Sequence, residues 1–425
     1  MQPLRWAAEV AEYRIQADEL YAAYIAGDIS AKEFVQTHHP RLSRWQGMGE
    51  YPFTEVAYAD IQLALTEWYY FESWQHLEEW AEEASSPGSR VSSFEAAAEA
   101  ILSGNLSRLD ALLRLYPSLI GHRSLRRHHA SLLHYIAANG VEYRDDYPMN
   151  AVALLDRLLA AGADVDATAG MYGGGVTTLG LVATSIHPAK VGLLIPLLDR
   201  LIAAGAALDA PDAAGNHQRI VNGCLANGRP EAAVYLAQRG AQLDLEGAAG
   251  VGRLDLVEEY FEPDGRLKPG ITLKPGISQT QLQRAFNWAC EYGHTLVVSY
   301  LMDKGVSAGE PVDGMNGLHM SLLGGHLDTI RLLIARGAPL EAQNGYGGTA
   351  LGMALWTIEH RDPVHTWPEA TIDNVAVIEA LINAGAEVGP KILAGLQWQQ
   401  DRLDPSIVAG IEAVLRRHGI EPWKS

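Results

Sequence analysis

The sequence contains little cysteine and no long apolar run. Of its 425 residues, only Cys224 and Cys290 are cysteines, too few for a disulfide framework or a cysteine zinc site. No run of about eighteen apolar residues occurs, so we expect no membrane span. The first residues lack the basic region and the long apolar stretch of a signal peptide. Together these features favour a reducing cytoplasm as the location.

Positive charge and phenylalanine are also scarce. Lys and Arg number 32 against 51 Asp and Glu, for a formal net charge of −19. A field of that sign repels phosphate backbones, so we do not expect a nucleic acid partner. Phe numbers only 6, whereas Trp (10) and Tyr (17) are commoner and suit half-wet binding surfaces. No G-x-S-x-G, phosphate-loop, dinucleotide or zinc-ligand signature occurs, so we expect no cofactor and no metal.

What is present is a repeat. A helical run that ends in Gly and continues into a short extended piece recurs along the chain, as in LLAAGADVDA, LIAAGAALDA and LLIARGAPLEA. The glycine of each copy supplies the left-handed conformation that closes a helix. These capping glycines are Gly162, Gly205, Gly240, Gly305, Gly337 and Gly385. The double-length step from Gly240 to Gly305 holds one further, degenerate unit in residues 247–265.

The beginnings of the units align as well. The aligned segments are SLLHYIAANG, TTLGLVATS, FNWACEYGH, GLHMSLLGGH and TALGMALWT. Period, Leu/Ala pattern and terminal Gly-Ala together resemble the ankyrin repeat, whose signature is T-P-L-H-x-A-A-x-x-G-H. The resemblance covers roughly residues 94–390. It implies an all-α solenoid of about eight helix pairs with short hairpin fingers, whose inner helices and fingers line a concave surface.

The two ends of the chain differ from the repeats. The start resembles a helical leader found on some bacterial ankyrin proteins, in which a helix ends near a Tyr-Gly-Phe-x-Ser-Trp-Pro turn. Here Tyr70 replaces the Gly and Gln75 replaces the Pro. The Pro/Gly/Ser-rich SSPGSRVSS favours a linker. The expected organisation is an N-terminal helical domain (1–85), a linker (86–93), the repeat array (94–390) and C-terminal capping helices with Trp398 and Trp423 (391–425).

The signature histidine of the repeat is present in two units, as His134 and His319. In ankyrin proteins this histidine resembles a brace that hydrogen-bonds backbone between adjacent units, so the resemblance implies a structural role for both. The same position in the other units holds Gly180, Asn222, Glu246, Asn287 and Gly352.

The positions that follow on each inner helix are uneven in size. The middle units carry small residues, Gly223, Ala226, Gly247 and Gly250. The flanking units carry large ones, Tyr135, Trp288, Met320, Met353 and Trp356. Either these enclose a hollow of the apolar kind that binds small molecules, or the small residues only allow close helix packing. Polar candidates for such a hollow are Asn222, Glu246, Asn287, Glu291 and Tyr292.

Glu246 and Glu291 are the candidate catalytic residues if the chain is an enzyme. A carboxylate in an apolar hollow has a raised pKa and can act as a general acid or base. For Glu246, the alternative is a solvated or helix-capping glutamate with no catalytic role.

Insertions and fingers supply further candidates. The inserted segments are 141–150, 186–192, 359–373 and the Pro/Gly-rich 263–280, which is expected to be a flexible loop or lid. The polar residues of these segments match no metal motif, so ion pairs or ordinary solvated loop charges are expected there: Asp145, Asp146, His187, His360, Asp362 and His365. Two matching fingers, AGMYGGGVT and QNGYGGTAL, present Tyr172 and Tyr346 either as exposed contact residues or packed on a neighbouring finger.

Two functions stay open besides a purely structural role. The first is a binding protein whose concave groove and fingers recognise another protein, with an acidity that suits a basic partner. The second is a cofactor-free enzyme or receptor that holds an apolar small molecule in the groove for isomerase-, lyase- or cyclase-type acid–base chemistry. Aromatic walls would suit a carbocation in such a site. Whether the chain is an enzyme is therefore undecided.

Overall fold

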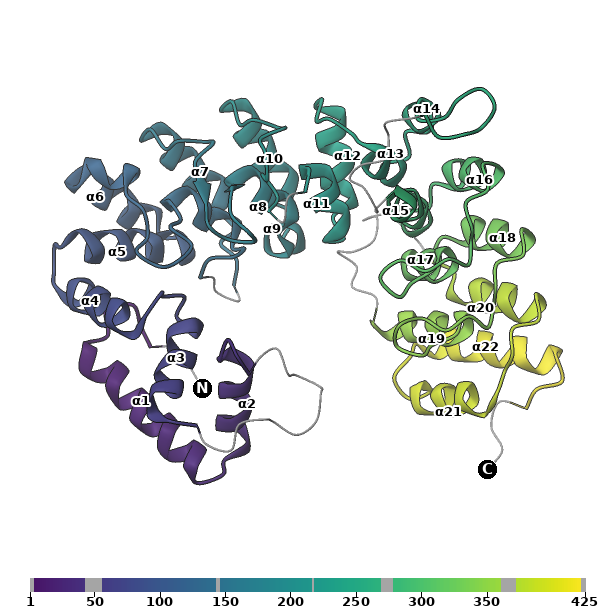
Figure 1. Cartoon of the computed structure of the whole chain (residues 1–425), viewed down its shortest axis with the longest axis horizontal. Helices are drawn as coiled ribbons and strands as arrows, with labels where there is room; N and C mark the ends of the chain where they lie inside the picture. The colour runs from purple at the N-terminus through teal and green to yellow at the C-terminus, as the bar shows by residue number, and fades with distance from the viewer. Residues whose placement is uncertain are drawn as a thin grey trace. The chain divides into compact units, whose positions relative to one another are not determined.

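The computed structural model describes residues 4–42, 56–142, 146–215, 218–268, 278–360 and 372–421. Its contacts divide the chain into two compact units, Met1–Gln218 and Arg219–Ser425, and each is described by itself. Apart from one two-stranded ladder, the regular structure of the described residues is helical (Figure 1). The prediction of an all-α fold is confirmed.

The elements of unit 1 are α1 (Val10–Ile25), α2 (Ile29–His38), α3 (Tyr58–Trp68), α4 (Trp74–Ser85), α5 (Arg90–Leu102), α6 (Leu106–Leu115), η2 (Pro117–Gly121), η3 (Leu132–Ala137), α7 (Ala151–Ala160), β1 (Thr168–Ala169), β2 (Val176–Thr177), α8 (Thr178–Thr184), α9 (Ile186–Lys190) and α10 (Leu194–Ala203). The strands pair antiparallel, with Thr168 opposite Thr177, and form one finger.

The elements of unit 2 are α11 (Ile220–Ala226), α12 (Pro230–Gln238), α13 (Leu245–Gly250), α14 (Leu254–Glu258), α15 (Ser278–Glu291), α16 (Thr295–Asp303), α17 (Gly317–Gly324), α18 (Leu327–Ala335), α19 (Ala350–His360), α20 (Asn374–Asn383), α21 (Pro390–Gln399) and α22 (Pro405–Arg417). The last two are the pair of helices expected at the C-terminal end. Trp398 is 58% exposed there, and Trp423 lies outside the described residues.

Helices α1 to α4 pack around a core of their own. The ring of Tyr13 meets those of Tyr69 (5.2 Å) and Trp80 (6.4 Å) edge-on. Between α3 and α4 the chain turns at Tyr70, whose φ of 66° is the left-handed value that a glycine adopts freely. The turn forms although the glycine of the resembling leader is absent. The predicted linker 86–93 is only partly irregular, because Ser89 caps α5 and residues 90–93 are helical.

The repeats of both units form two rows of helices. In unit 1 an inner row, α5, η3 and α8, lies against an outer row, α6, α7 and α10. The inner element η3 is a short 3₁₀ helix rather than a full α-helix, and it ends where Ala138 adopts φ 47°. In unit 2 the inner row α11, α13, α15, α17 and α19 and the outer row α12, α14, α16, α18 and α20 follow the chain alternately (Figure 1).

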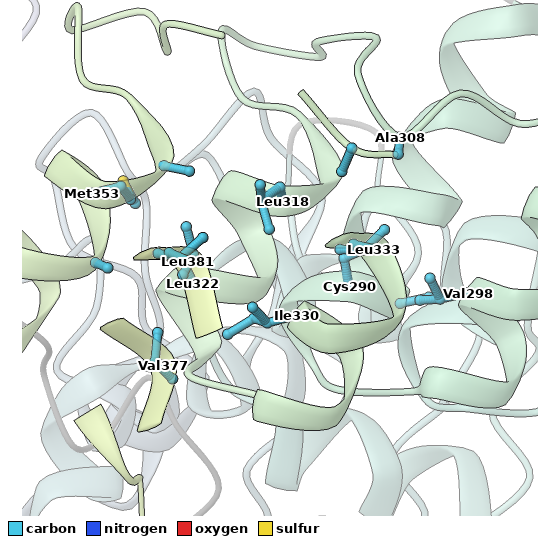
Figure 2. Close-up of a cluster of buried hydrophobic side chains, with 14 of the residues drawn as sticks. Cys290, Val298, Ala308, Leu318, Leu322, Ile330, Leu333, Met353, Val377 and Leu381 are labelled. Carbon is cyan, nitrogen blue, oxygen red and sulfur yellow. The ribbon is translucent and has the colours of Figure 1, made fainter. Parts of the chain in front are cut away.

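The core of unit 2 lies between its two rows. Figure 2 shows Leu318 and Leu322 of α17 in one buried cluster with Ile330 and Leu333 of α18. The cluster continues to Cys290 of α15 and through α19 and α20. Burying each side chain of this size contributes about 1.5–3 kcal/mol. No helix among the described residues combines the length and apolarity needed to cross a membrane.

All six predicted capping glycines have positive φ, from 79° at Gly337 to 98° at Gly240. A Cβ atom added at any of the six would meet no heavy atom within 4 Å. Their conformation, rather than a close approach, is therefore what requires glycine.

Gly180 differs from these glycines. A Cβ atom at this position in α8 would lie 1.7 Å from the carbonyl oxygen of Ala213, in the finger of the next unit. That carbonyl also accepts a hydrogen bond from the backbone N–H of Thr177 (3.1 Å). Gly352 occupies the same repeat position in α19, and its nearest neighbour would be the Cδ1 atom of Ile392 at an ordinary 3.6 Å.

The substitutions Gly180→Ala and Gly352→Ala should therefore have opposite effects. We expect Gly180→Ala to destabilise the protein by about 2 kcal/mol or more, because the finger backbone must move. Gly352→Ala should be neutral or stabilise by up to about 1 kcal/mol, because alanine favours the helix. Urea denaturation of both variants measures the difference. Wild-type stability of Gly180→Ala would contradict the close contact of finger and helix.

Candidate functional site

The signature position of each repeat faces the next unit. Asn287 is 3% exposed, and its Nδ2 donates a hydrogen bond to the carbonyl oxygen of Met315 in the next finger (2.9 Å). Asn222 is 7% exposed, and its Nδ2 donates to Oδ2 of Asp244 (2.9 Å). Both amides are candidates for the lining of a hollow on sequence grounds, but their Nδ2 donors are directed to the following unit.

His134 and His319 are both buried, and the ring of each accepts a hydrogen bond from the backbone of its own unit. The backbone N–H of Ser131 donates to Nδ1 of His134 (3.2 Å), and that of Asn316 donates to Nδ1 of His319 (3.4 Å). Burial lowers the pKa of His134 to about 4. Burial also lowers the pKa of His319, which the backbone of Ala342 in the next finger opposes. Both rings are therefore neutral at physiological pH, and their structural role stays a prediction.

Glu246 is neither solvated nor a helix cap. Asp244 caps α13 by accepting a hydrogen bond from the N–H of Gly247 (2.8 Å), and Glu246 is only 6% exposed. Nη1 of Arg284, on α15, lies 3.8 Å from its Oε1, while Nη2 lies 3.6 Å from Oδ2 of Asp313. Burial raises the pKa of Glu246 to about 7, Arg284 opposes this rise and Asp244 adds to it.

Glu291 is the last residue of helix α15, and Tyr292 follows it. Burial raises the pKa of Glu291 to about 7, and a hydrogen bond with Tyr292 opposes the rise. The hydroxyl of Tyr292 donates to the carbonyl oxygen of Leu225 on α11 (2.5 Å). Both candidate catalytic carboxyls therefore have the raised pKa that acid–base chemistry uses, but Tyr292 serves as a contact between helices.

The positions expected to floor a hollow are filled. A Cβ atom at Gly247 would lie 2.8 Å from Oδ1 of Asn222, and one at Gly250 would lie 2.4 Å from Cδ1 of Leu225. Gly223 is buried within α11. Helices α11 and α13 thus approach each other closely, which is the packing alternative of the sequence analysis.

The large residues of the predicted groove separate into buried and exposed sets. Trp288 and Met353 are each 7% exposed, and Tyr135 is 2% exposed beside a cavity of about 10 Å³, room for about one water molecule. Met320 is half-buried. Trp356 is 47% exposed and stacks on His360, with ring centres 4.6 Å apart.

The two finger tyrosines also differ. Tyr172 is 43% exposed and its hydroxyl donates to Oδ1 of Asn139 (2.7 Å), so it is packed on its neighbours. Tyr346 is 95% exposed. The loop that carries it is held by Asn344, whose Oδ1 accepts from the N–H of Tyr346 (3.0 Å) and of Gly348 (2.9 Å). Sequence reasoning missed Asn344, although an Asn before a Gly-rich turn is a usual signal for this geometry.

A second missed group lies at the C-terminal end of unit 2. The guanidinium of Arg402 lies 3.8 Å from the centre of the Trp398 ring and 3.0 Å from Oε1 of Glu359. Glu359 is on α19, one turn from Trp356, and α19 contacts α21. Arg402, which follows α21, therefore joins the exposed ring of Trp398 to the partly buried Glu359 of α19.

The inserted segments are described only in part. Asp145, Asp362, His365 and residues 269–277 of the expected lid lie outside the described residues. Asp146 borders the small cavity beside Tyr135, and His187 lies in α9. In the part of the chain that the structure describes, no three His, Cys, Asp or Glu side chains are grouped to hold a metal ion.

The raised pKa values predict a pH-dependent stability. The folded-state pKa of Glu246 is about 7, above its usual 4.5, so its contribution to stability is complete below about pH 4.5 and lost as pH rises through about 7. Glutamine resembles the protonated acid and does not titrate. We therefore expect Glu246→Gln to reduce the loss of unfolding free energy between low pH and about pH 7 by up to about 3 kcal/mol. Urea denaturation between pH 5 and pH 8 measures it. The control is Glu310→Gln, because Glu310 is exposed. If the unfolding free energy changed with pH equally in the two variants, the raised pKa of Glu246 would be contradicted.

Comparison with known proteins agrees with the repeat geometry. Residues 245–344 and 286–366 match the family model described as ankyrin repeats in three copies. The chain is similar to the human ASB11 ankyrin repeat domain, with 18% identity over 61% of this chain and 100% of that one and a TM-score of 0.29.

The chain is also similar to the ankyrin repeat domain of Bcl-3, a member of the IkappaB protein family. The identity is 18% over 61% of this chain and 92% of that one, with a TM-score of 0.31. No curated protein matches the sequence. The family match identifies ankyrin repeats in residues 245–366, and the stacked helix pairs and fingers there have the geometry of this repeat.

Proposed function

We propose that this chain binds a protein partner through the fingers and inner helices of unit 2, with Tyr346 and Trp356 as principal contacts. Ankyrin repeats generally mediate protein–protein interaction, which supports a protein-binding role. The finer assignment rests on one observation. Of the aromatic groove and finger residues of unit 2, Tyr346 and Trp356 are exposed, whereas Trp288 and Tyr292 are buried.

Tyr346 has the properties of an interface anchor. Its ring is exposed, yet the hydrogen bonds of Asn344 fix the backbone that carries it. A large aromatic side chain on a pre-organised loop loses little conformational freedom when it binds. Tyr and Trp are also the residue types that most often dominate interface energies.

The charge around this finger favours a basic partner. The N–H of Gly345 donates to the carbonyl oxygen of Gly314 (2.8 Å), which joins the Tyr346 finger to its neighbour. The neighbouring finger carries Asp313, whose side chain is 84% exposed and also pairs with Arg284 at 3.6 Å. With a formal net charge of −19, the chain attracts a Lys- or Arg-containing segment over a long range. We propose the cytoplasm as the location of this interaction.

Binding is tested with a displayed library of random peptides selected against the full chain. We expect the selected peptides to be rich in Lys, Arg and apolar residues, and their affinity to fall as salt rises. Tyr346→Ala and Trp356→Ala should each weaken binding at least tenfold, or about 1.4 kcal/mol.

Leu296 supplies the matched control. It is 75% exposed on the outer helix α16, so Leu296→Ala removes an exposed apolar side chain away from the proposed surface. Its affinity should equal that of the wild type. If Leu296→Ala weakened binding as much as Tyr346→Ala, or if neither aromatic variant changed it, the proposed surface would be wrong.

The small-molecule alternative is supported only by the raised pKa of Glu246 and Glu291. The filled positions at Gly247 and Gly250 reduce its support. Differential scanning fluorimetry against a library of apolar compounds tests it, because a ligand that binds the folded state raises the melting temperature. We expect no compound to shift the wild type and Glu246→Gln differently. A related series that did so would reinstate the pocket.

A further inference from the structure

The contact of helices α1 to α4 with the first repeat is built around one buried guanidinium. Arg126 is 7% exposed and precedes η3. Its Nη1 donates to the carbonyl oxygen of Tyr69 (2.9 Å), and its guanidinium carbon lies 4.7 Å from the centre of the Trp80 ring. Tyr69 follows α3 and Trp80 lies in α4. Arg126 therefore holds the leading helices to the repeats.

Two carboxyl groups compete for this guanidinium. Oε1 of Glu142 lies 2.5 Å from Nε of Arg126, and its Oε2 lies 3.5 Å from Nε2 of His128. Oε2 of Glu95, on α5, is 4.0 Å from Nη2 of Arg126. Oε1 of Glu95 instead accepts a hydrogen bond from Nε1 of Trp80 (3.1 Å). The ion pair of Arg126 with Glu95 is therefore weaker than its ion pair with Glu142.

None of the other groups named here provides a second positive charge for Glu95. Tyr13 of α1 and Tyr135 of η3 are phenols, and Glu95 adds to the rise in the pKa of each. The neighbouring guanidinium, Arg127, binds both carboxylate oxygens of Glu67 (2.8 and 2.9 Å). An ionised Glu95 would therefore be a second buried negative charge on one guanidinium, which is costly in a low-dielectric interior.

We propose that Glu95 makes the docking of α1 to α4 on the first repeat proton-dependent: the neutral acid holds the contact, and the carboxylate loosens it. Burial raises the pKa of Glu95 to about 7, Arg126 opposes the rise and Glu142 adds to it. For Glu142, burial is outweighed by Arg126 and His128, which lower its pKa to about 2. Above about pH 5.5, one pH unit above the ordinary pKa of a glutamate, Glu142 is ionised in both states and the dependence belongs to Glu95.

The direction of the effect follows from the raised pKa. Opening the contact hydrates Glu95 and returns its pKa to about 4.5. The stabilisation is therefore complete below about pH 4.5 and is lost as pH rises to about 7. Within this window the equilibrium for opening should increase by up to about tenfold per pH unit, and it should be constant above about pH 7.

Amide hydrogen exchange of the full chain, read by mass spectrometry between pH 5 and pH 8 and corrected for intrinsic exchange rates, tests the proposal. We expect opening of peptides from α3 and α4 to follow this profile in the wild type. Glu95→Gln should abolish the pH dependence in those peptides and leave α16 and α18 unchanged. Glu99→Gln, on the same helix, is the control and should retain it.

Glu142→Gln keeps the test decisive if Glu95→Gln folds poorly. Without the charge of Glu142, Arg126 stabilises the carboxylate of Glu95 more strongly and lowers its pKa. The midpoint of the pH profile should therefore move to lower pH. A side chain that only fills space would not move a midpoint. A wild type without pH dependence in α3 and α4, an unchanged dependence in Glu95→Gln, or an unmoved midpoint in Glu142→Gln would each overturn the proposal.

Discussion

The repeats depend on the contact between the signature position of an inner helix and the finger of the next unit. Asn287 bonds the carbonyl of Met315, His319 interacts with the backbone of Ala342, and Gly180 lies against the carbonyl of Ala213. One position in the repeat thus satisfies a buried backbone group or makes room for it. Asn, His and Gly at this position therefore meet the same packing requirement in different ways.

In the degenerate unit, the residue at the signature position faces a side chain instead of the finger backbone. The insertion expected over 263–280 ends earlier, because α15 begins at Ser278. The partner of Glu246 is a side chain of that helix, Arg284, at 3.8 Å. A carboxylate with one distant cation and few donors loses much of its hydration without a full replacement. This is why its pKa rises toward neutrality while the Asn at the same position elsewhere remains a simple hydrogen-bond donor.

The far ends of the inner helices meet with similar closeness. Nε2 of His294 is 2.9 Å from the carbonyl oxygen of Gly250, and a Cβ atom at Gly293 would lie 2.4 Å from the His326 ring. A Cβ atom at Gly324 would lie 2.0 Å from the carbonyl oxygen of Glu291. Inner helices seated against each other at both ends leave little room between them, so small residues there indicate contact rather than a cavity.

Local features of this chain are readable from sequence, and long-range ones are not. Capping glycines such as Gly162 were predictable because a helix ends by local backbone geometry, and their φ values agree. Gly247 looks the same in sequence, but its requirement comes from Asn222 on another helix. The partners of Glu246 and Glu95 likewise depend on which side chains the fold brings together, which no spacing along the chain specifies.

The same distinction separates the bracing positions from the proposed binding positions. Asn287 and His319 are buried, so a change there disturbs two units at once. Tyr346 is held through Asn344, which fixes the finger backbone while the tyrosine ring makes no contribution to the core. A substitution of the ring therefore alters the surface without altering the stacking. A repeat built in this way can change its partner by exchanging finger-tip side chains, because the residues that hold the repeats together lie elsewhere.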